Sequence, residues 1–304
     1  MSNELALVIL LSCSCFDNRS IRRIEHILKS GVNWFQVFNL AVQRQTAYLM
    51  YSALKKLHYL HLLPGSLRAF WGVSYDGNFR RNQRLIEEKT QIVTELQKRE
   101  IPVYPIKGIA LLKSVYEDIG VRYLNDIDFL IPPQYCTAVC KTLDQLQLKP
   151  LYINDVDPYL YSPNVQGCHS LFCTKSLANP HDVDFCCDFA FVLFDSENHP
   201  EFFQYITERL NALASAPAFH ATHILLLCLY YYYIMERSEF PTNLESENLI
   251  KLIDIHTYIS HYWGDKVQCE LGKASERFHL DHIISYVMDS IKRFQTEDIA
   301  SWIL

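Results

Sequence analysis

The chain has 304 residues, 49% of them hydrophobic, and a formal net charge of −6. Single hydrophobic cores stop growing near about 250–300 residues, so this length favours two or three packed units. The negative charge argues against the nucleic-acid backbone as the main partner, because proteins that follow phosphates normally carry a basic excess. The strongest basic run, FRRNQR at 79–84, is expected to be the solvated start of a helix.

The ten cysteines are too few for a disulfide scaffold of this length, and none forms a Cys-x-x-Cys pair. Such usage is typical of a reduced, cytoplasmic protein. The apolar run at 5–16 follows no Lys or Arg and is too short to span a bilayer, so we expect a buried helix and no membrane association. A zinc site is an open alternative, although its spacing matches no standard structural pattern; its ligands would be Cys168, His169, Cys173 and His181.

Residues 1–100 show helical periodicity and predict an N-terminal helical region. A helix is expected at 20–30, with Ser20 as its cap and Gly31 as its stop. Residues 33–60 predict two helices. A long amphipathic helix is expected at 82–101, because no glycine or proline interrupts its apolar face.

From Ile101 onward, short apolar runs replace the helical pattern. Strands are predicted at 101–108, 122–132, 150–154, 169–175 and 181–194, with helices at 109–120 and 134–148. Residues 101–200 are therefore expected to form a small α+β core with a mixed sheet. Residues 201–304 return to helices. The four tyrosines at 230–233 are expected to pack in the core of a buried helix rather than to stack on bases.

Two carboxylates, Asp126 and Asp128, stand inside the apolar run at 122–132. On a strand they share one face, while Ile127 points into the core. Two carboxylates on one face repel each other unless a cation lies between them. Mg²⁺ or Mn²⁺, carrying the phosphates of a substrate, suits such a pair. The alternative is an edge strand with its polar face in water, and the pattern alone leaves both open.

Two neighbouring features favour the metal hypothesis. Lys107 and Gly108 stand between a predicted strand and a predicted helix, where free N–H groups and a lysine charge favour phosphate. Two-metal phosphoryl chemistry generally needs a third carboxylate from another strand. Asp184 is the candidate, whereas Asp182 and Asp188 on the same face are better explained as exposed positions of an edge strand.

The segment IPVYPIKGIALLKSVYEDIGVRYLNDIDFLI, at 101–131, closely resembles the signature of an uncharacterised bacterial nucleotidyltransferase-like family in the DNA polymerase β superfamily. The resemblance extends over nearly the whole chain, although only 101–131 is specific. It implies that Asp126 and Asp128 are the metal pair and Asp184 the third carboxylate. Nucleotide-binding positions are also implied, namely Lys107, Gly108 at a phosphate-facing turn, Arg122 near the mouth of the triphosphate site, and Asn125.

The resemblance predicts an α+β nucleotidyltransferase core flanked by N- and C-terminal helical regions. The implied activity is Mg²⁺- or Mn²⁺-dependent transfer of a nucleoside monophosphate from a nucleoside triphosphate such as ATP. The acceptor would be a small molecule, a peptide or a protein. Asp126, Asp128 and Asp184 would hold the metals, and Lys107 and Arg122 would stabilise developing charge.

Departures from the superfamily pattern support an alternative. Lys107 and Gly108 replace the usual Gly-Ser, so a phosphate-binding hydroxyl is missing, and Asn125 replaces the serine often found before the Asp-x-Asp. The alternative is a catalytically silent module for nucleotide sensing, peptide binding or a toxin–antitoxin-like role. A third, weaker hypothesis is a helical hydrolase site built from His220, His223 and Asp254.

Overall fold

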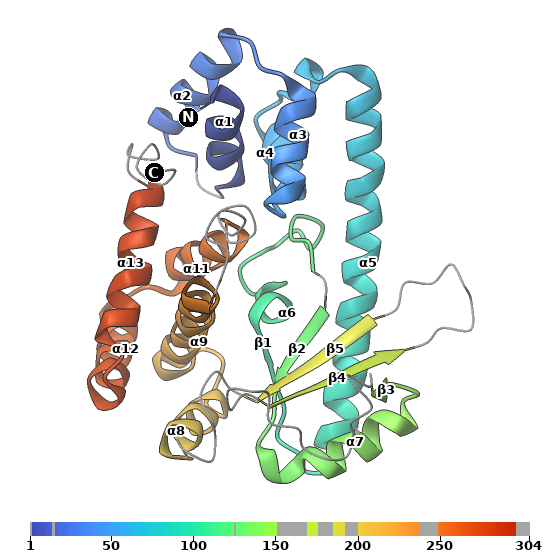
Figure 1. Cartoon of the computed structure of the whole chain (residues 1–304), viewed down its shortest axis with the longest axis vertical. Coiled ribbons are helices and arrows are strands. Elements are labelled where there is room, and N and C mark those ends of the chain that lie inside the picture. Colours follow the sequence, from blue (N-terminus) through green and yellow to red (C-terminus); the bar gives the residue numbers. More distant parts are fainter. Residues whose placement is uncertain are drawn as a thin grey trace.

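The structure is a computed structural model that describes residues 2–13, 16–124, 126–150, 169–175, 185–191, 200–237 and 249–295. In these ranges, helices lie before and after a five-stranded sheet in the chain (Figure 1). The predicted α+β class, with a small mixed sheet between helical regions, is confirmed. No helix in the described ranges is long and apolar enough to cross a membrane.

The N-terminal helices are α1 (Asn3–Ser12), α2 (Asn18–Lys29), α3 (Trp34–Gln43), α4 (Ala47–Lys56), the short η1 (Leu60–Leu62) and α5 (Gly65–Gln97). α1 buries Leu7 and Leu11 completely, so the expected buried first helix is confirmed. The two helices predicted at 33–60 are α3 and α4. The prediction of Ser20 as a cap was wrong, because Asp17 caps α2 by accepting a 2.7 Å hydrogen bond from the Ser20 amide.

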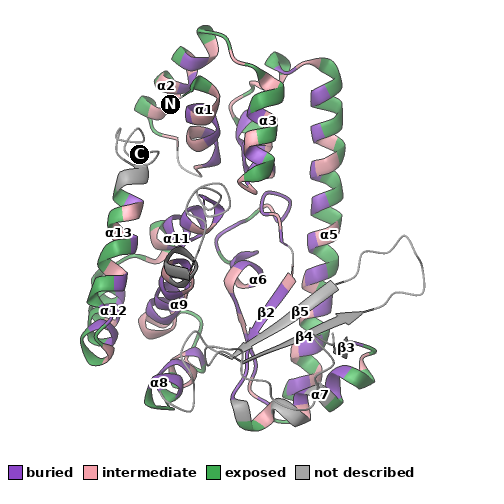
Figure 2. Cartoon of the chain, viewed as in Figure 1, coloured by how far each residue is buried: buried purple, intermediate pink, exposed green. Residues whose placement is uncertain are grey.

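α5 is much longer than predicted, because it begins at Gly65 instead of near residue 82. Gly72 and Gly77 lie within this helix and do not end it. At Gly72 an added Cβ would lie 3.0 Å from the Tyr51 hydroxyl, so the glycine allows α4 and α5 to pack closely. The basic run at 79–84 therefore lies inside α5 and not at its start. Buried and exposed residues alternate along α5, whereas β2 and α6 are mostly buried (Figure 2).

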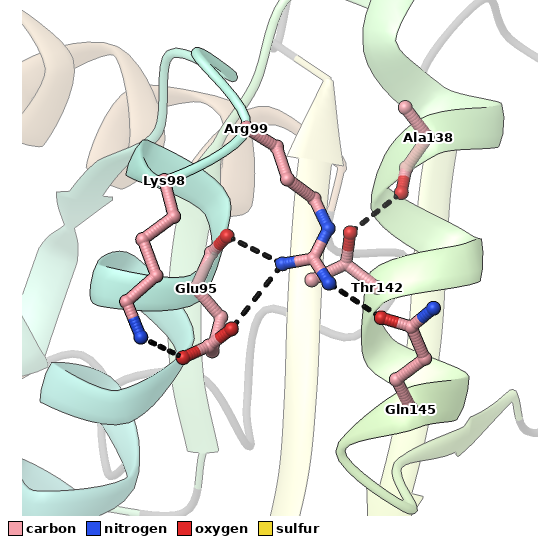
Figure 3. Close-up of polar contacts among 6 residues, drawn as sticks. All are labelled: Glu95, Lys98, Arg99, Ala138, Thr142 and Gln145. Atoms are coloured by element: carbon pink, nitrogen blue, oxygen red, sulfur yellow. Dashed lines mark hydrogen bonds and ion pairs between the residues drawn. The ribbon is translucent and has the colours of Figure 1, made fainter.

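The end of α5 is fastened to α7 (Cys136–Gln145), as Figure 3 shows. Arg99, just beyond α5, donates 2.8 Å and 3.3 Å hydrogen bonds to the Glu95 carbonyl and carboxylate. Its other terminal nitrogen donates to the Gln145 side-chain oxygen at 2.5 Å. Lys98 also pairs with Glu95 at 2.6 Å. The loop that leads into the first strand therefore starts from a fixed position.

The strands are β1 (Tyr104–Ile106), β2 (Asp126–Leu130), β3 (Lys149–Pro150), β4 (His169–Lys175) and β5 (Phe185–Phe191), in the sheet order β1-β2-β5-β4-β3. Among the strand pairs of the described residues, β2–β5 alone is parallel, so the sheet is mixed as predicted. The helix predicted at 109–120 is wrong in extent. α6 (Lys107–Leu111) ends after five residues, and residues 112–124 form a turn-rich loop.

The C-terminal helices are α8 (Pro200–Leu210), α9 (Pro217–Arg237), α11 (Leu249–Tyr262), α12 (Asp265–Phe278) and α13 (Asp281–Gln295). α9 packs against α8, α11, α12 and α13, and α11 also packs against α6. This last contact brings the C-terminal helices to the start of β2. The buried side chains of all three parts form one hydrophobic cluster, and the division at residues 100 and 200 stays a prediction.

Candidate active site

Asp126 and Asp128 lie on one face of β2, and a cavity of about 220 Å³ opens beside them. Asp126 is partly exposed and Asp128 is 6% exposed, while Ile127 is fully buried on the opposite face as predicted. The cavity is lined by Gln45, Lys107, Gly108, Arg122, Leu124, Asp126, Asp128, Leu227, Tyr230, Lys251 and Asp254. The core and the C-terminal helices thus contribute to one site.

Lys107 turns towards the carboxylates. Its Nζ lies 2.8 Å from Asp128 Oδ1, and both side chains are largely buried. The same Nζ lies 4.2 Å from the centre of the Tyr230 ring. Lys107 has a φ of 54°, a left-handed conformation that is unfavourable for a residue with a Cβ. The predicted nucleotide-binding lysine is therefore at the site, and its charge faces a carboxylate.

Gly108 lines the cavity beside Lys107, and its place at a phosphate-facing turn stays a prediction. The left-handed residue at this turn is Lys107, so the glycine is not needed for backbone freedom. It is needed for space, because a Cβ on Gly108 would lie 2.6 Å from Leu124 Cδ2 and 3.4 Å from Arg122 Nη2. The absence of a side chain lets the loop at 112–124 approach α6.

Gly108→Ala is expected to lower the free energy of unfolding by about 1–3 kcal/mol, because the new methyl group overlaps the buried Leu124 side chain. Urea unfolding monitored by circular dichroism measures this change. In a Leu124→Ala background the same glycine substitution should cost less, since the overlapping atom is gone. An equal cost in both backgrounds would contradict the steric explanation.

Arg122 lines the cavity and is buried, at 8% exposed. Its Nη2 lies 2.8 Å from Asp254 Oδ2, and its Nε donates to both oxygens of Asp254, at 3.1 Å and 3.2 Å. Tyr116 donates a 2.8 Å hydrogen bond to the same carboxylate. Burial alone lowers the pKa of Arg122, but the charge and hydrogen bonds of Asp254 raise it above its ordinary value. Arg122 thus forms a neutralised wall of the cavity.

Two asparagines of α5 hold the loop that carries Arg122. Asn78 Nδ2 donates to the Gly120 carbonyl at 2.7 Å, and Asn82 Nδ2 donates to the Ile119 and Arg122 carbonyls at 2.6 Å each. Neither asparagine was predicted to contribute to the site. A signal was present, since they stand four residues apart and fall on the buried side of α5 where apolar residues are expected.

Tyr230 and Lys251 were also missed. Tyr230 is only partly buried, and its ring centre lies 5.6 Å from the Lys251 Nζ as well as near Lys107. Of the four consecutive tyrosines, Tyr231 packs in the core as predicted, at 2% exposed, but Tyr230 lines the cavity. The available signal was Lys251 itself, a single lysine inside the apolar run NLIKLIDI.

Asp184, the predicted third carboxylate, lies outside the described residues, as do Asn125 and Asp182. The backbone register pairs Asp188 of β5 with Asp128 of β2 in parallel, so these positions share one face of the sheet. The interpretation of Asp188 as an edge-strand position was wrong, since β5 lies between β2 and β4.

Among the described residues no group of three or more His, Cys, Asp or Glu side chains forms a metal cluster. Asp126 and Asp128 nevertheless fit Mg²⁺, which commonly binds one or two carboxylates and takes its remaining oxygens from water and phosphate. Cys168 and His181, two ligands of the alternative zinc site, lie outside the described residues.

The helical hydrolase hypothesis fits the structure poorly. Asp254 is bonded to Arg122, and His220 Nδ1 lies 3.0 Å from the Tyr258 hydroxyl. His223 is buried, and its burial lowers its pKa from the usual 6.5 to about 4. These side chains are explained by the partners that they already have.

An α+β fold that presents two carboxylates to a cavity with lysines is the arrangement expected of a nucleotidyltransferase. Residues 30–289 match the model of the uncharacterised nucleotidyltransferase family, and the chain belongs to that family. The match includes every residue described above as lining the cavity. The resemblance found at 101–131 is thereby confirmed at the level of the family. Neither the curated proteins nor the solved structures contain a match to this chain.

Proposed function

We propose that the chain is a Mg²⁺- or Mn²⁺-dependent nucleotidyltransferase that moves a nucleoside monophosphate from a triphosphate such as ATP to a small-molecule, peptide or protein acceptor. The observation that carries the proposal is the pair Asp126 and Asp128, which share one face of β2 at a cavity that also contains lysines. Membership of the family supports the reaction class.

In this proposal each part of the site has a distinct task. Asp126 and Asp128 would hold the metal, and Asp184 would complete the site and orient or deprotonate the acceptor. A bound divalent metal neutralises charge on the triphosphate. Lys107 and Lys251 would bind phosphate oxygens, with Asn125 and Gly108 beside them. Arg122 keeps the cavity wall in place through Asp254.

The test is nucleotide transfer from labelled triphosphates, with Mg²⁺ or Mn²⁺ and a panel of acceptors. The double variant Asp126→Asn/Asp128→Asn is expected to lose at least about a thousandfold in rate, because its amides bind a divalent cation much more weakly. Asp144→Asn, at an exposed position of α7, is the matched control and should keep full activity. Equal transfer by the wild type and the double variant would contradict the mechanism.

The second candidate function, a silent nucleotide-binding module, is favoured by one observation. Lys107 already compensates the charge of Asp128, so the site has a cation of its own. Calorimetric titration with a triphosphate, with and without Mg²⁺, separates the two functions. Tight binding that needs no metal and leads to no turnover would favour the module.

A further inference from the structure

We propose that Lys107 is the resident counter-ion of Asp128 in the nucleotide-free protein and that a divalent metal binds Asp128 only when this lysine leaves. Metal and nucleotide binding are then coupled, because the phosphates of the nucleotide take over the lysine. The inference rests on the proposed function and specifies how the metal reaches its site.

The competition between lysine and metal follows from the contact between Lys107 and Asp128. Lys107 Nζ lies 2.8 Å from Asp128 Oδ1, and the side chains are 19% and 8% exposed. A divalent cation bound to the same oxygen would lie within a few ångströms of the ammonium group, where two positive charges with little water between them repel strongly. The ammonium and the metal therefore compete for Asp128.

The backbone conformation of Lys107 is unfavourable, so surrounding contacts must stabilise it. Lys107 has a φ of 54°, in the left-handed region that glycine adopts freely and other residues adopt unfavourably. Unfavourable backbone conformations persist where surrounding contacts compensate for them, and they occur often at functional sites. Here the compensating contacts include the ion pair with Asp128 and the Tyr230 ring, 4.2 Å from Nζ.

A ligand in the cavity could also bind Lys107 after this side chain leaves Asp128. Lys107 and Lys251 lie near the same Tyr230 ring, at 4.2 Å and 5.6 Å, so two positive charges border the space beside the carboxylates. A triphosphate in this space offers Lys107 anionic oxygens in place of Asp128. Because coupling between two binding equilibria is reciprocal, the nucleotide should tighten metal binding and the metal should tighten nucleotide binding by the same factor.

The test measures Mn²⁺ binding to the full chain by the electron paramagnetic resonance signal of free Mn²⁺. This binding measurement does not depend on catalytic turnover. Lys107→Met removes the charge and keeps the length of the side chain, and Lys107→Gly also relieves the left-handed backbone. Without nucleotide, both variants should bind Mn²⁺ about tenfold more tightly than the wild type. Lys141→Met, the control, removes a charge from an exposed position of α7 outside the residues that line the cavity, and it should leave the Mn²⁺ affinity unchanged.

A second titration includes the non-hydrolysable analogue α,β-methylene ATP. The analogue should tighten Mn²⁺ binding more in the wild type than in either Lys107 variant, because only the wild type has a lysine to displace. Equal Mn²⁺ affinities for the wild type and both Lys107 variants would overturn the inference alone, since analogue-dependent Mn²⁺ binding would still support the proposed function. No Mn²⁺ binding by any of these proteins, with or without the analogue, would overturn both.

Discussion

Replacement of Asp254 by Ala is expected to lower the free energy of unfolding by about 3–5 kcal/mol, because it leaves the buried Arg122 guanidinium without its counter-charge. Asp254 is 3% exposed and accepts hydrogen bonds from Arg122 and Tyr116. The Tyr116 hydroxyl would lose its acceptor in the same step. Urea unfolding should show a lower midpoint with an unchanged slope.

Two comparisons sharpen the Asp254 experiment. The double variant Arg122→Met/Asp254→Leu should be less destabilised than Asp254→Ala, since no buried charge remains unpaired. Asp289→Ala breaks an ion pair between two exposed side chains, Asp289 at 58% and Lys292 at 69% exposure. This change should lower the free energy of unfolding by less than about 1 kcal/mol. A loss below about 1 kcal/mol for Asp254→Ala would show that water reaches Arg122.

Acidification is expected to destabilise the protein between pH 6.5 and about pH 4, and His223 should contribute roughly 3 kcal/mol of the loss. Burial, together with a smaller effect of the nearby His220, lowers the pKa of His223 to about 4. Above pH 6.5 the imidazole is neutral in both the folded and unfolded chain. As the pH falls, the unfolded chain binds the proton first, so folding becomes less favourable until the folded form also titrates.

His220 and His256 should add to the same acid sensitivity, because burial lowers the pKa of each. The measurement is the free energy of unfolding in urea at pH 7 and at pH 4.5. His223→Phe, which keeps an aromatic ring beside Phe219 and Tyr258, should reduce the difference between these two values. His61→Phe, at an exposed position, should leave the difference unchanged. The same pH dependence in wild type and His223→Phe would contradict the assignment.

The elements with strong local patterns could be predicted from the sequence. A strand with Ile127 inward and the carboxylates on the other face follows from alternation, although β2 (Asp126–Leu130) is shorter than the predicted strand at 122–132. The start of α5 could not be predicted in this way, because Gly72 breaks a helical pattern unless Tyr51 is known to pack against it. The end of α6 was not predicted because contacts from α5 override a local helical pattern. Residues 109–120 look helical, but Asn78 and Asn82 hold part of that stretch as a loop.

The site was only partly predictable for a related reason. Lys107, Gly108, Asp126 and Asp128 lie close together in the sequence, so a strand–helix–strand pattern is enough to bring them together. Tyr230, Lys251 and Asp254 reach the same cavity from helices more than about a hundred residues away, through tertiary packing that no local pattern encodes. The pairing of Arg122 with Asp254 could not be predicted either, because the sequence does not show that Arg122 is buried or which carboxylate lies beside it.

The asparagine contacts of α5 also bear on how readily the cavity accepts a substrate. A 33-residue helix that packs on the N-terminal helices at one end and is fastened near α7 at the other cannot shift locally at Asn78 and Asn82 without breaking its own hydrogen bonds. The wall formed by Arg122 is therefore set before any ligand arrives. An incoming molecule need not order this side of the site, so the conformational entropy lost on binding falls mainly on the ligand itself.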